Sequence, residues 1–182
     1  MRKVNVIMGL ILALALGGQP QPALSGPEPG KFFLVGLGPA GPEHATLKAL
    51  NTMKQADLIL AYPELVEPFK AYLEGKEIYD PWPGLWFNPR DRKLSPEARK
   101  ALITEKTRQR DAFVKKMQGL LEEGKNIALL TGGDPTMYSR AFWLMEGLRE
   151  DQVEIIPGLG SIGAAMAALK KAATGGGARF VL

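Results

Sequence analysis

The chain has 182 residues, of which 46% are hydrophobic and 23% charged, and its formal net charge is +4. This composition is ordinary for a globular protein and long enough for one domain with a core, so disorder is not indicated. The absence of cysteine excludes disulfides and thiolate metal sites, and a single histidine, His44, excludes a metal site built from histidines. The small net charge gives no reason to expect a nucleic-acid partner.

The amino terminus is typical of a secretory signal peptide. Arg2 and Lys3 precede an apolar run over residues 6–16, and helix breakers and a small-x-small pattern at residues 23–25 follow. The apolar run is too short for an ordinary membrane span. We therefore expect residues 1–25 to be cleaved and the protein to be exported or periplasmic, with no stable membrane span. An uncleaved anchor and a misassigned start codon are the alternatives, and the second would leave the protein cytoplasmic.

Residues 26–30 are expected to be a linker, and an α/β domain is expected over residues 31–156. Short apolar runs, which predict strands, alternate there with longer segments that predict helices. The expected strands are residues 32–35, 58–61, 77–79, 126–130 and 153–156, of which the third is an edge strand. The expected helices are residues 46–55, 63–73, 96–124, 138–149 and 162–172, of which the second is irregular. This alternation predicts a doubly wound parallel sheet.

Three positions carry the signals of helix ends. Thr46 is a plausible amino-terminal cap, and Ser95 followed by a proline starts the longest helix in a favoured way. Gly124 is expected to end that helix.

An aromatic and basic loop is expected over residues 80–93. It places Trp82, Trp86 and Phe87 among prolines, arginines and a lysine. Such a loop could stack on a macrocycle and pair with its carboxylates, because aromatic rings stack on flat ligands and arginine forks match carboxylate geometry. We favour the alternative, a solvated loop whose tryptophans pack on their own domain.

Three glycine-rich turns, at residues 36–41, 132–135 and 157–161, each follow an expected strand. In an open parallel sheet, ligands bind at the carboxyl ends of the strands, where backbone without Cβ atoms can approach closely and helices offer unpaired N–H groups. The three turns therefore predict a cofactor site at that edge.

The first turn also matches the Gly-x-Gly-x-x-Gly pattern of dinucleotide-binding domains. That pattern requires an acidic residue at the end of the second strand. Asp57 stands instead at the beginning of this strand, Tyr62 and Pro63 stand at its end, and Pro42 is awkward just inside the expected helix. We keep dinucleotide binding only as a lesser alternative.

Five motifs in order resemble the tetrapyrrole (corrin/porphyrin) methylase family over residues 31–173. They are Val-Gly-Leu-Gly-Pro at 35–39, Thr-Leu-Lys-Ala-Leu at 46–50, Ala-Asp-Leu-Ile-Leu at 56–60, Gly-Lys at 124–125 leading to Gly-Asp-Pro at 133–135, and Ile-Pro-Gly with Ser161 at 156–161. Members of the family use S-adenosyl-L-methionine to methylate precorrins, cobalt-precorrins and uroporphyrinogen.

The resemblance implies roles for the turns. The cofactor-binding residues would be Gly132, Gly133, Asp134, Pro135, Pro157 and Gly158, and the substrate-binding residues Gly36, Gly38 and Pro39. Asp134 would accept hydrogen bonds from the cofactor, although aspartate in such a turn is more often a helix cap. No catalytic residue is assigned, because the cofactor carries the reactive group. The resemblance implies a tetrapyrrole partner and leaves a homodimer open.

The chain also departs from the family pattern. After Pro39 the family reads Gly-Asp-Pro, whereas this chain reads Ala40-Gly41-Pro42, so an acidic side chain is missing. Family members hold the cofactor between two domains, and residues 157–182 are expected to be only the start of the second. We therefore expect methyl transfer by a full-length protein and no turnover by this chain alone. Because S-adenosylmethionine is made in the cytoplasm, an exported, non-catalytic tetrapyrrole-binding module remains the alternative.

Overall fold

The computed structural model describes residues 28–177, so the expected signal peptide lies outside the described residues. Its centre is a five-stranded parallel sheet in the order β3-β2-β4-β1-β5. The strands are β1 Phe32–Gly36, β2 Leu58–Leu60, β3 Glu77–Tyr79, β4 Ile127–Thr131 and β5 Val153–Ile156. All five predicted strands are confirmed, and β3 lies at an edge as expected.

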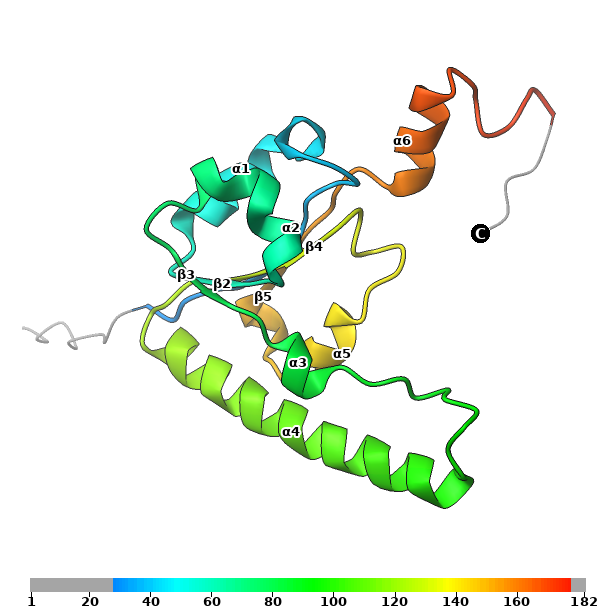
Figure 1. The fold of residues 1–182 in the computed structure, drawn as a ribbon. Helices are drawn as coiled ribbons and strands as arrows, with labels where there is room; N and C mark the ends of the chain where they lie inside the picture. The colour runs from blue at the N-terminus through cyan, green and yellow to red at the C-terminus, as the bar shows by residue number, and fades with distance from the viewer. Residues whose placement is uncertain (1–27, 178–182) are drawn as a thin grey trace, which may run out of the picture.

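Helices cover both faces of the sheet, with α1 and α2 on one side and α3, α4 and α5 on the other (Figure 1). The α-helices are α1 Leu47–Gln55, α2 Pro63–Val66, α3 Trp82–Leu85, α4 Pro96–Glu122, α5 Ala141–Met145 and α6 Ser161–Ala168. The 3-10 helices are η1 Pro42–His44, η2 Glu67–Tyr72 and η3 Glu150–Gln152. None of the helices between residues 28 and 177 combines the length and apolar composition that a membrane crossing needs. The predicted doubly wound α/β fold is confirmed.

The core is divided by the sheet into two layers because strand side chains alternate between its faces. In β4, Ala128 and Leu130 pack in the layer of α1 and η2, while Ile127 and Leu129 pack in the layer of α4 and α5. The central strands are thus apolar on both faces, which is why they read as continuous apolar runs in the sequence.

The predicted helix ends are confirmed. Thr46 and Ser95 each accept a hydrogen bond from the backbone N–H three residues later, at 3.1 and 3.2 Å, at the starts of α1 and α4. Gly124, just beyond α4, adopts a φ of 82°, the left-handed conformation that ends many helices.

Two predicted helices are shorter than expected. The prediction of a helix over residues 138–149 is wrong in extent, because α5 covers only five of these residues. The Ser139 hydroxyl accepts from the Ala141 N–H at its start, and Gly147 turns the chain away with a φ of 95°. The helix predicted over residues 162–172 stops at Ala168, where Lys170 adopts a φ of 53°.

The loop predicted over residues 80–93 contains one helical turn, α3. The Asp80 carboxylate accepts a hydrogen bond from the Trp82 N–H at 2.9 Å, which starts this turn. The prediction of a loop over residues 80–93 was therefore incomplete, because the segment contains a helical turn.

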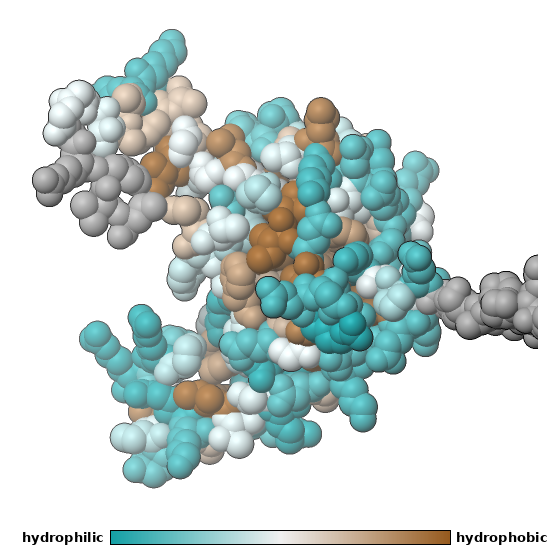
Figure 2. Space-filling view, turned by 180° about the vertical axis from the view of Figure 1, so that it is seen from behind, coloured by the Kyte–Doolittle hydropathy of each residue, from teal (hydrophilic) through white to brown (hydrophobic). Residues whose placement is uncertain are grey.

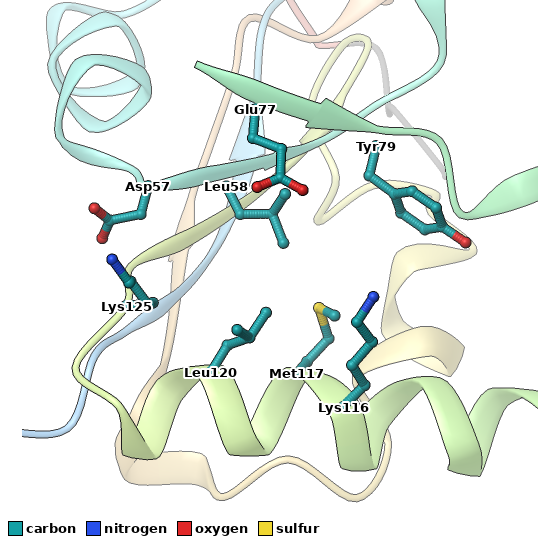
Figure 3. Close-up of a pocket in the computed structure, with 8 residues that line it drawn as sticks. All are labelled: Asp57, Leu58, Glu77, Tyr79, Lys116, Met117, Leu120 and Lys125. Carbon is teal, nitrogen blue, oxygen red and sulfur yellow. The ribbon is translucent and has the colours of Figure 1, made fainter. Parts of the chain in front are cut away.

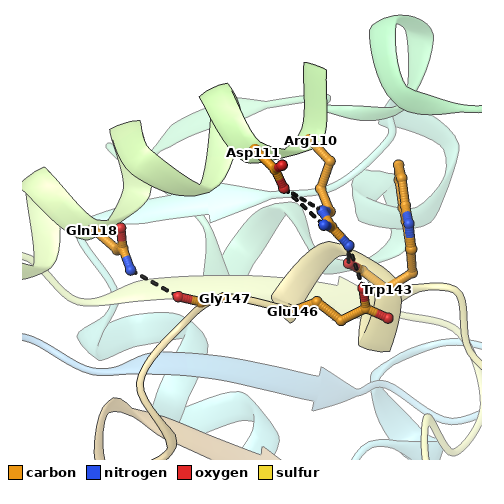
Figure 4. Close-up of polar contacts among 6 residues, drawn as sticks. All are labelled: Arg110, Asp111, Gln118, Trp143, Glu146 and Gly147. Carbon is orange, nitrogen blue, oxygen red and sulfur yellow. Dashed lines mark hydrogen bonds and ion pairs between the residues drawn. The ribbon is translucent and has the colours of Figure 1, made fainter. Parts of the chain in front are cut away.

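A buried arginine fastens α4 to α5 (Figure 4). Arg110 is only 9% exposed and donates hydrogen bonds to the carboxylates of Asp111 and Glu146, and it stacks on the Trp143 ring at 5.3 Å. Burial alone would lower the pKa of Arg110, but the hydrogen bonds to Asp111 and Glu146 outweigh it and the pKa is raised. The charged arginine thus fixes the position of α5 against α4.

Candidate functional site

The first two glycine turns are joined at the carboxyl edge of the sheet. The Gly38 N–H donates to the Gly133 carbonyl at 3.2 Å, and the Gly133 N–H donates to the Gly38 carbonyl at 2.7 Å. Both glycines have a positive φ, 78° and 69°, which other residues adopt only with strain. The turns after β1 and β4 therefore form one unit of backbone.

The third turn packs directly beneath this unit. A Cβ on Gly158 would lie 2.2 Å from the Gly133 carbonyl oxygen, and a Cβ on Gly36 would lie 2.6 Å from both the Gly158 nitrogen and Pro135 Cδ. Gly36 and Pro135 are buried, so they support the site from below, whereas Pro157 is exposed. Glycine is required at positions 36 and 158 because three backbone segments meet there.

A cleft of about 420 Å³ opens between the turn after β4 and the start of α6, and we call it the cofactor cleft. Its lining residues are Gly132, Gly133, Asp134, Met137, Tyr138, Gly160, Ser161, Ile162 and Gly163. The start of α6 has no side-chain cap within the part of the chain that the structure describes. The first residues of this helix line the cleft, and their N–H groups have no partner within the helix.

Asp134 lies in the cofactor cleft but caps no helix. Its Oδ1 accepts from the Thr136 N–H at 3.0 Å and from the Thr136 hydroxyl at 2.8 Å, which closes a local turn. The next helix, α5, begins only at Ala141. Among residues 28–177, no hydrogen bond reaches the second carboxylate oxygen, Oδ2. The alternative of a helix cap is therefore wrong, and a negative charge remains at the cleft.

A second cleft, of about 660 Å³, runs along the first turn. Its lining residues are Gly38, Pro39, Ala40, Gly41, Tyr62, Glu64, Leu65, Pro68, Gly132, Gly133 and Ser161. Gly132, Gly133 and Ser161 line both clefts, so the two lie side by side, and we call them together the trough. The structure thus brings the predicted substrate residues Gly38 and Pro39 next to the predicted cofactor residues Gly132 and Gly133.

The trough continues into two hollows bounded by the aromatic loop. One, of about 260 Å³, is lined by Tyr62, Trp82, Trp86 and Arg140, and the other, of about 510 Å³, is lined by Trp86, Asn88, Pro89, Arg90, Tyr138 and Arg140. Tyr62 lines both the first hollow and the trough, and Tyr138 lines both the second hollow and the trough. Figure 2 shows the surface receding between the α6 lobe and the lobe formed by this loop and the start of α4.

The expectation that the tryptophans of the loop pack on their own domain is confirmed for Trp82 and wrong for Trp86. Trp82 and Phe87 pack on the domain, as expected, but Trp86 is 60% exposed. Sequence reasoning missed Tyr138 and Arg140, because they fell in the overlong helix predicted there. Their position shortly after the Gly-Asp-Pro turn, at the carboxyl edge of the sheet, was the signal that could have found them.

A separate cavity of about 210 Å³ lies between α4 and the β2-β3 edge (Figure 3). Lys116 lies over the Tyr79 ring at 5.8 Å, and the Asp57 carboxylate accepts from the Asn126 N–H at 2.8 Å. Lys116 and Asp57 are thus engaged within the chain, and Glu77 and Lys125 also line the cavity. The cavity includes the amino ends of β2 and β3, away from the glycine turns, so we do not count it as part of the site.

The geometry does not favour dinucleotide binding. Asp57 lies at the amino end of β2, and the first turn leads into a 3-10 helix, η1, rather than into an α-helix. The acidic residue and the helix start that a dinucleotide needs are both missing at the first turn.

A doubly wound domain with a glycine-built trough at the carboxyl edge of its parallel sheet defines the class of α/β ligand-binding and enzyme domains. The family model described as Tetrapyrrole (Corrin/Porphyrin) Methylases matches residues 31–182. The chain therefore belongs to the tetrapyrrole methylase family, as its motifs predicted.

Two relatives of known or probable methyltransferase function support this membership. The chain is similar to the probable cobalt-precorrin-2 C(20)-methyltransferase of Methanocaldococcus jannaschii, at 31% identity over 76% of the chain and 57% of the relative. It is also similar to the chloroplastic S-adenosyl-L-methionine-dependent uroporphyrinogen III methyltransferase of Arabidopsis thaliana, at 30% identity over 72% of the chain and 31% of the relative.

A solved structure confirms the fold. The crystal structure of uroporphyrin-III-C-methyltransferase from Thermus thermophilus matches with a TM-score of 0.54 and 31% identity, over 81% of this chain and 56% of that one. The chain thus spans little more than half the length of this structure and of the archaeal relative.

Proposed function

We propose that the domain binds S-adenosylmethionine in the cofactor cleft and that the whole protein methylates a carbon of a tetrapyrrole. The observation that carries the proposal is the joined pair of turns at Gly38 and Gly133, which places an open backbone surface beside Asp134. Membership of a methyltransferase family and similarity to an S-adenosylmethionine-dependent relative support it.

The lining of the cofactor cleft fits the chemical groups of this cofactor. The Asp134 carboxylate can accept from the ammonium group, and the uncapped start of α6 offers N–H groups to the carboxylate. Met137 and Ile162 are exposed apolar side chains against which the adenine can pack. The N–H of Gly133 is not available to a ligand, because the Gly38 carbonyl already accepts from it.

The chain's own residues would bind and align rather than react. S-adenosylmethionine supplies a methyl group on a sulfonium, so the protein needs no nucleophile for the transfer. The rigid turns hold the cofactor on one side of the trough, and the side that Gly38 and Pro39 line is left for the methyl acceptor.

Replacing Asp134 with asparagine tests the ligand role of its charge. The substitution keeps an oxygen that can accept from Thr136, so the turn and the melting temperature should be retained. Loss of the charge should weaken S-adenosylhomocysteine binding about tenfold, the effect of losing one charge-assisted hydrogen bond. Calorimetric titration gives the affinity, and a thermal melt reports the fold.

The matched control is Asp151→Asn, at the amino end of β5 and outside the trough. It should leave the affinity for S-adenosylhomocysteine unchanged. Equal affinities of the wild type and the Asp134→Asn variant would remove this carboxylate from the cofactor site.

A further inference from the structure

We propose that Arg140, held between Trp86 and Phe87, is a carboxylate-recognition residue that fixes the rim of a ring-shaped polycarboxylate at the far end of the trough. The inference rests on the proposed function and adds a specific subsite for the substrate. It assigns a binding role to a loop for which stacking on a macrocycle was the less favoured of two expectations.

The first argument is how Arg140 is held. Its guanidinium lies 5.5 Å from the centre of the Trp86 ring and 5.2 Å from the centre of the Phe87 ring, both within the range of cation–π attraction. Phe87 is itself buried and packs edge-on against Trp143 at 5.5 Å. A half-buried arginine in contact with two rings has less conformational freedom, so less conformational entropy is lost when it binds a ligand.

The second argument is that Arg140 has no carboxylate of its own. Within residues 28–177, no acidic side chain forms an ion pair or hydrogen bond with it, whereas Arg110 contacts two carboxylates. Arg140 lines both nearby hollows, so a ligand that enters either of them can reach this side chain. A planar guanidinium that has no carboxylate partner within the described residues is suited to bidentate binding of a carboxylate from a ligand.

The third argument is the distribution of charge along the trough. The cofactor cleft carries Asp134 and the cleft along the first turn carries Glu64, while the hollows at the aromatic loop carry Arg90 and Arg140. The clefts therefore suit a cationic ligand and the hollows an anionic one. A sulfonium and ammonium at one end and peripheral acetate or propionate groups at the other would match this polarity.

The fourth argument is the surface against which a ring can lie. Trp86 is 60% exposed and Tyr138 is 89% exposed, and both line the hollow that Arg90 and Arg140 share. Exposed aromatic rings beside arginines form a binding surface for a large ring with carboxylates on its rim. The aromatic side chains stack on the apolar face of the ring, and the arginines pair with the carboxylates. The ligand class is thus a tetrapyrrole polycarboxylate.

The test is a titration of the purified chain with uroporphyrin, followed by the shift of its visible absorbance. We expect saturable binding by the wild type and a loss of about tenfold or more in affinity for Arg140→Gln, the effect of removing a charge-assisted pair. Arg140→Lys should recover only part of the loss, because lysine lacks the planar fork. Trp86→Leu should also weaken binding, because it removes the stacking surface.

Three controls separate this subsite from general effects. Arg149→Gln changes an exposed arginine that already pairs with Asp151 and should bind uroporphyrin as the wild type does. A porphyrin that carries N-methylpyridinium groups in place of carboxylates should not bind. Thermal melts identify any variant that has lost its fold, and the titration with S-adenosylhomocysteine should be the same for every folded variant.

Wild-type affinity of Arg140→Gln for uroporphyrin would overturn the proposal, as would equal binding of the cationic porphyrin. Failure of the wild type to bind uroporphyrin would overturn it as well. In each case, saturable binding of S-adenosylhomocysteine by the same protein would leave the proposed cofactor site standing. The two proposals can therefore be refuted independently.

Discussion

Replacement of Gly158 with alanine is expected to destabilise the domain by about 1–3 kcal/mol or more, the usual range for overpacking a closed interior. The added Cβ would lie 2.2 Å from the Gly133 carbonyl oxygen and 2.9 Å from the Gly36 carbonyl carbon. These are backbone atoms of two other turns, which cannot rotate away as a flexible side chain can. Denaturant unfolding of the wild type and the variant measures the change.

The same substitution at Gly163 is the matched control. In α6 the new Cβ would have as its nearest neighbour only Leu159 Cδ1, at 3.7 Å, which is an ordinary contact. Alanine is favoured over glycine inside a helix by about 1 kcal/mol, so this variant should be neutral or slightly stabilised. If Gly158→Ala were as stable as Gly163→Ala, the close packing of the three turns would be refuted.

Replacement of Phe69 with alanine is expected to cost about 3–5 kcal/mol of unfolding free energy, as for other buried aromatic residues. Phe69 lies in η2, is 0% exposed and packs in the core layer of α1. It anchors the irregular segment that also carries Glu64 and Leu65, which line the trough. We therefore expect loss of ligand binding together with the loss of stability.

Phe142→Ala makes the same chemical change at a residue that is 42% exposed. Its cost should be smaller, about 1 kcal/mol, because less apolar area leaves water when this side chain folds. Comparable losses for Phe69→Ala and Phe142→Ala would show that η2 is not anchored by Phe69.

The strands and helix starts could be predicted from the sequence because their causes are local or repeated. Ile127 to Leu130 are apolar without interruption since β4 is covered on both faces. Thr46 and Ser95 act on N–H groups only three residues away. The glycine turns were found for a similar reason, because each directly follows an apolar strand.

The rest of the site depends on contacts between residues far apart in the chain. Nothing in the first turn indicates that the Gly38 carbonyl will accept a hydrogen bond from the N–H of Gly133, a residue that the resemblance assigned to cofactor binding. Similarly, the helix pattern around Arg140 gave no sign that two rings of an earlier loop would hold its guanidinium. Such contacts depend on how the strands are ordered in the sheet. The local sequence pattern around each residue does not specify that order.

The most direct test of the central claim is an amide NMR titration of the labelled chain with S-adenosylhomocysteine, because this method also detects weak binding. We predict saturable shifts of the amide signals of Gly132, Gly133 and Gly160, which line the cofactor cleft. The signals of Gly75 and Gly119, which line none of the hollows at the carboxyl edge, should stay unchanged. Unmoved signals from the three cleft glycines at saturating ligand, or shifts confined to Gly75 and Gly119, would contradict a cofactor site at the glycine turns.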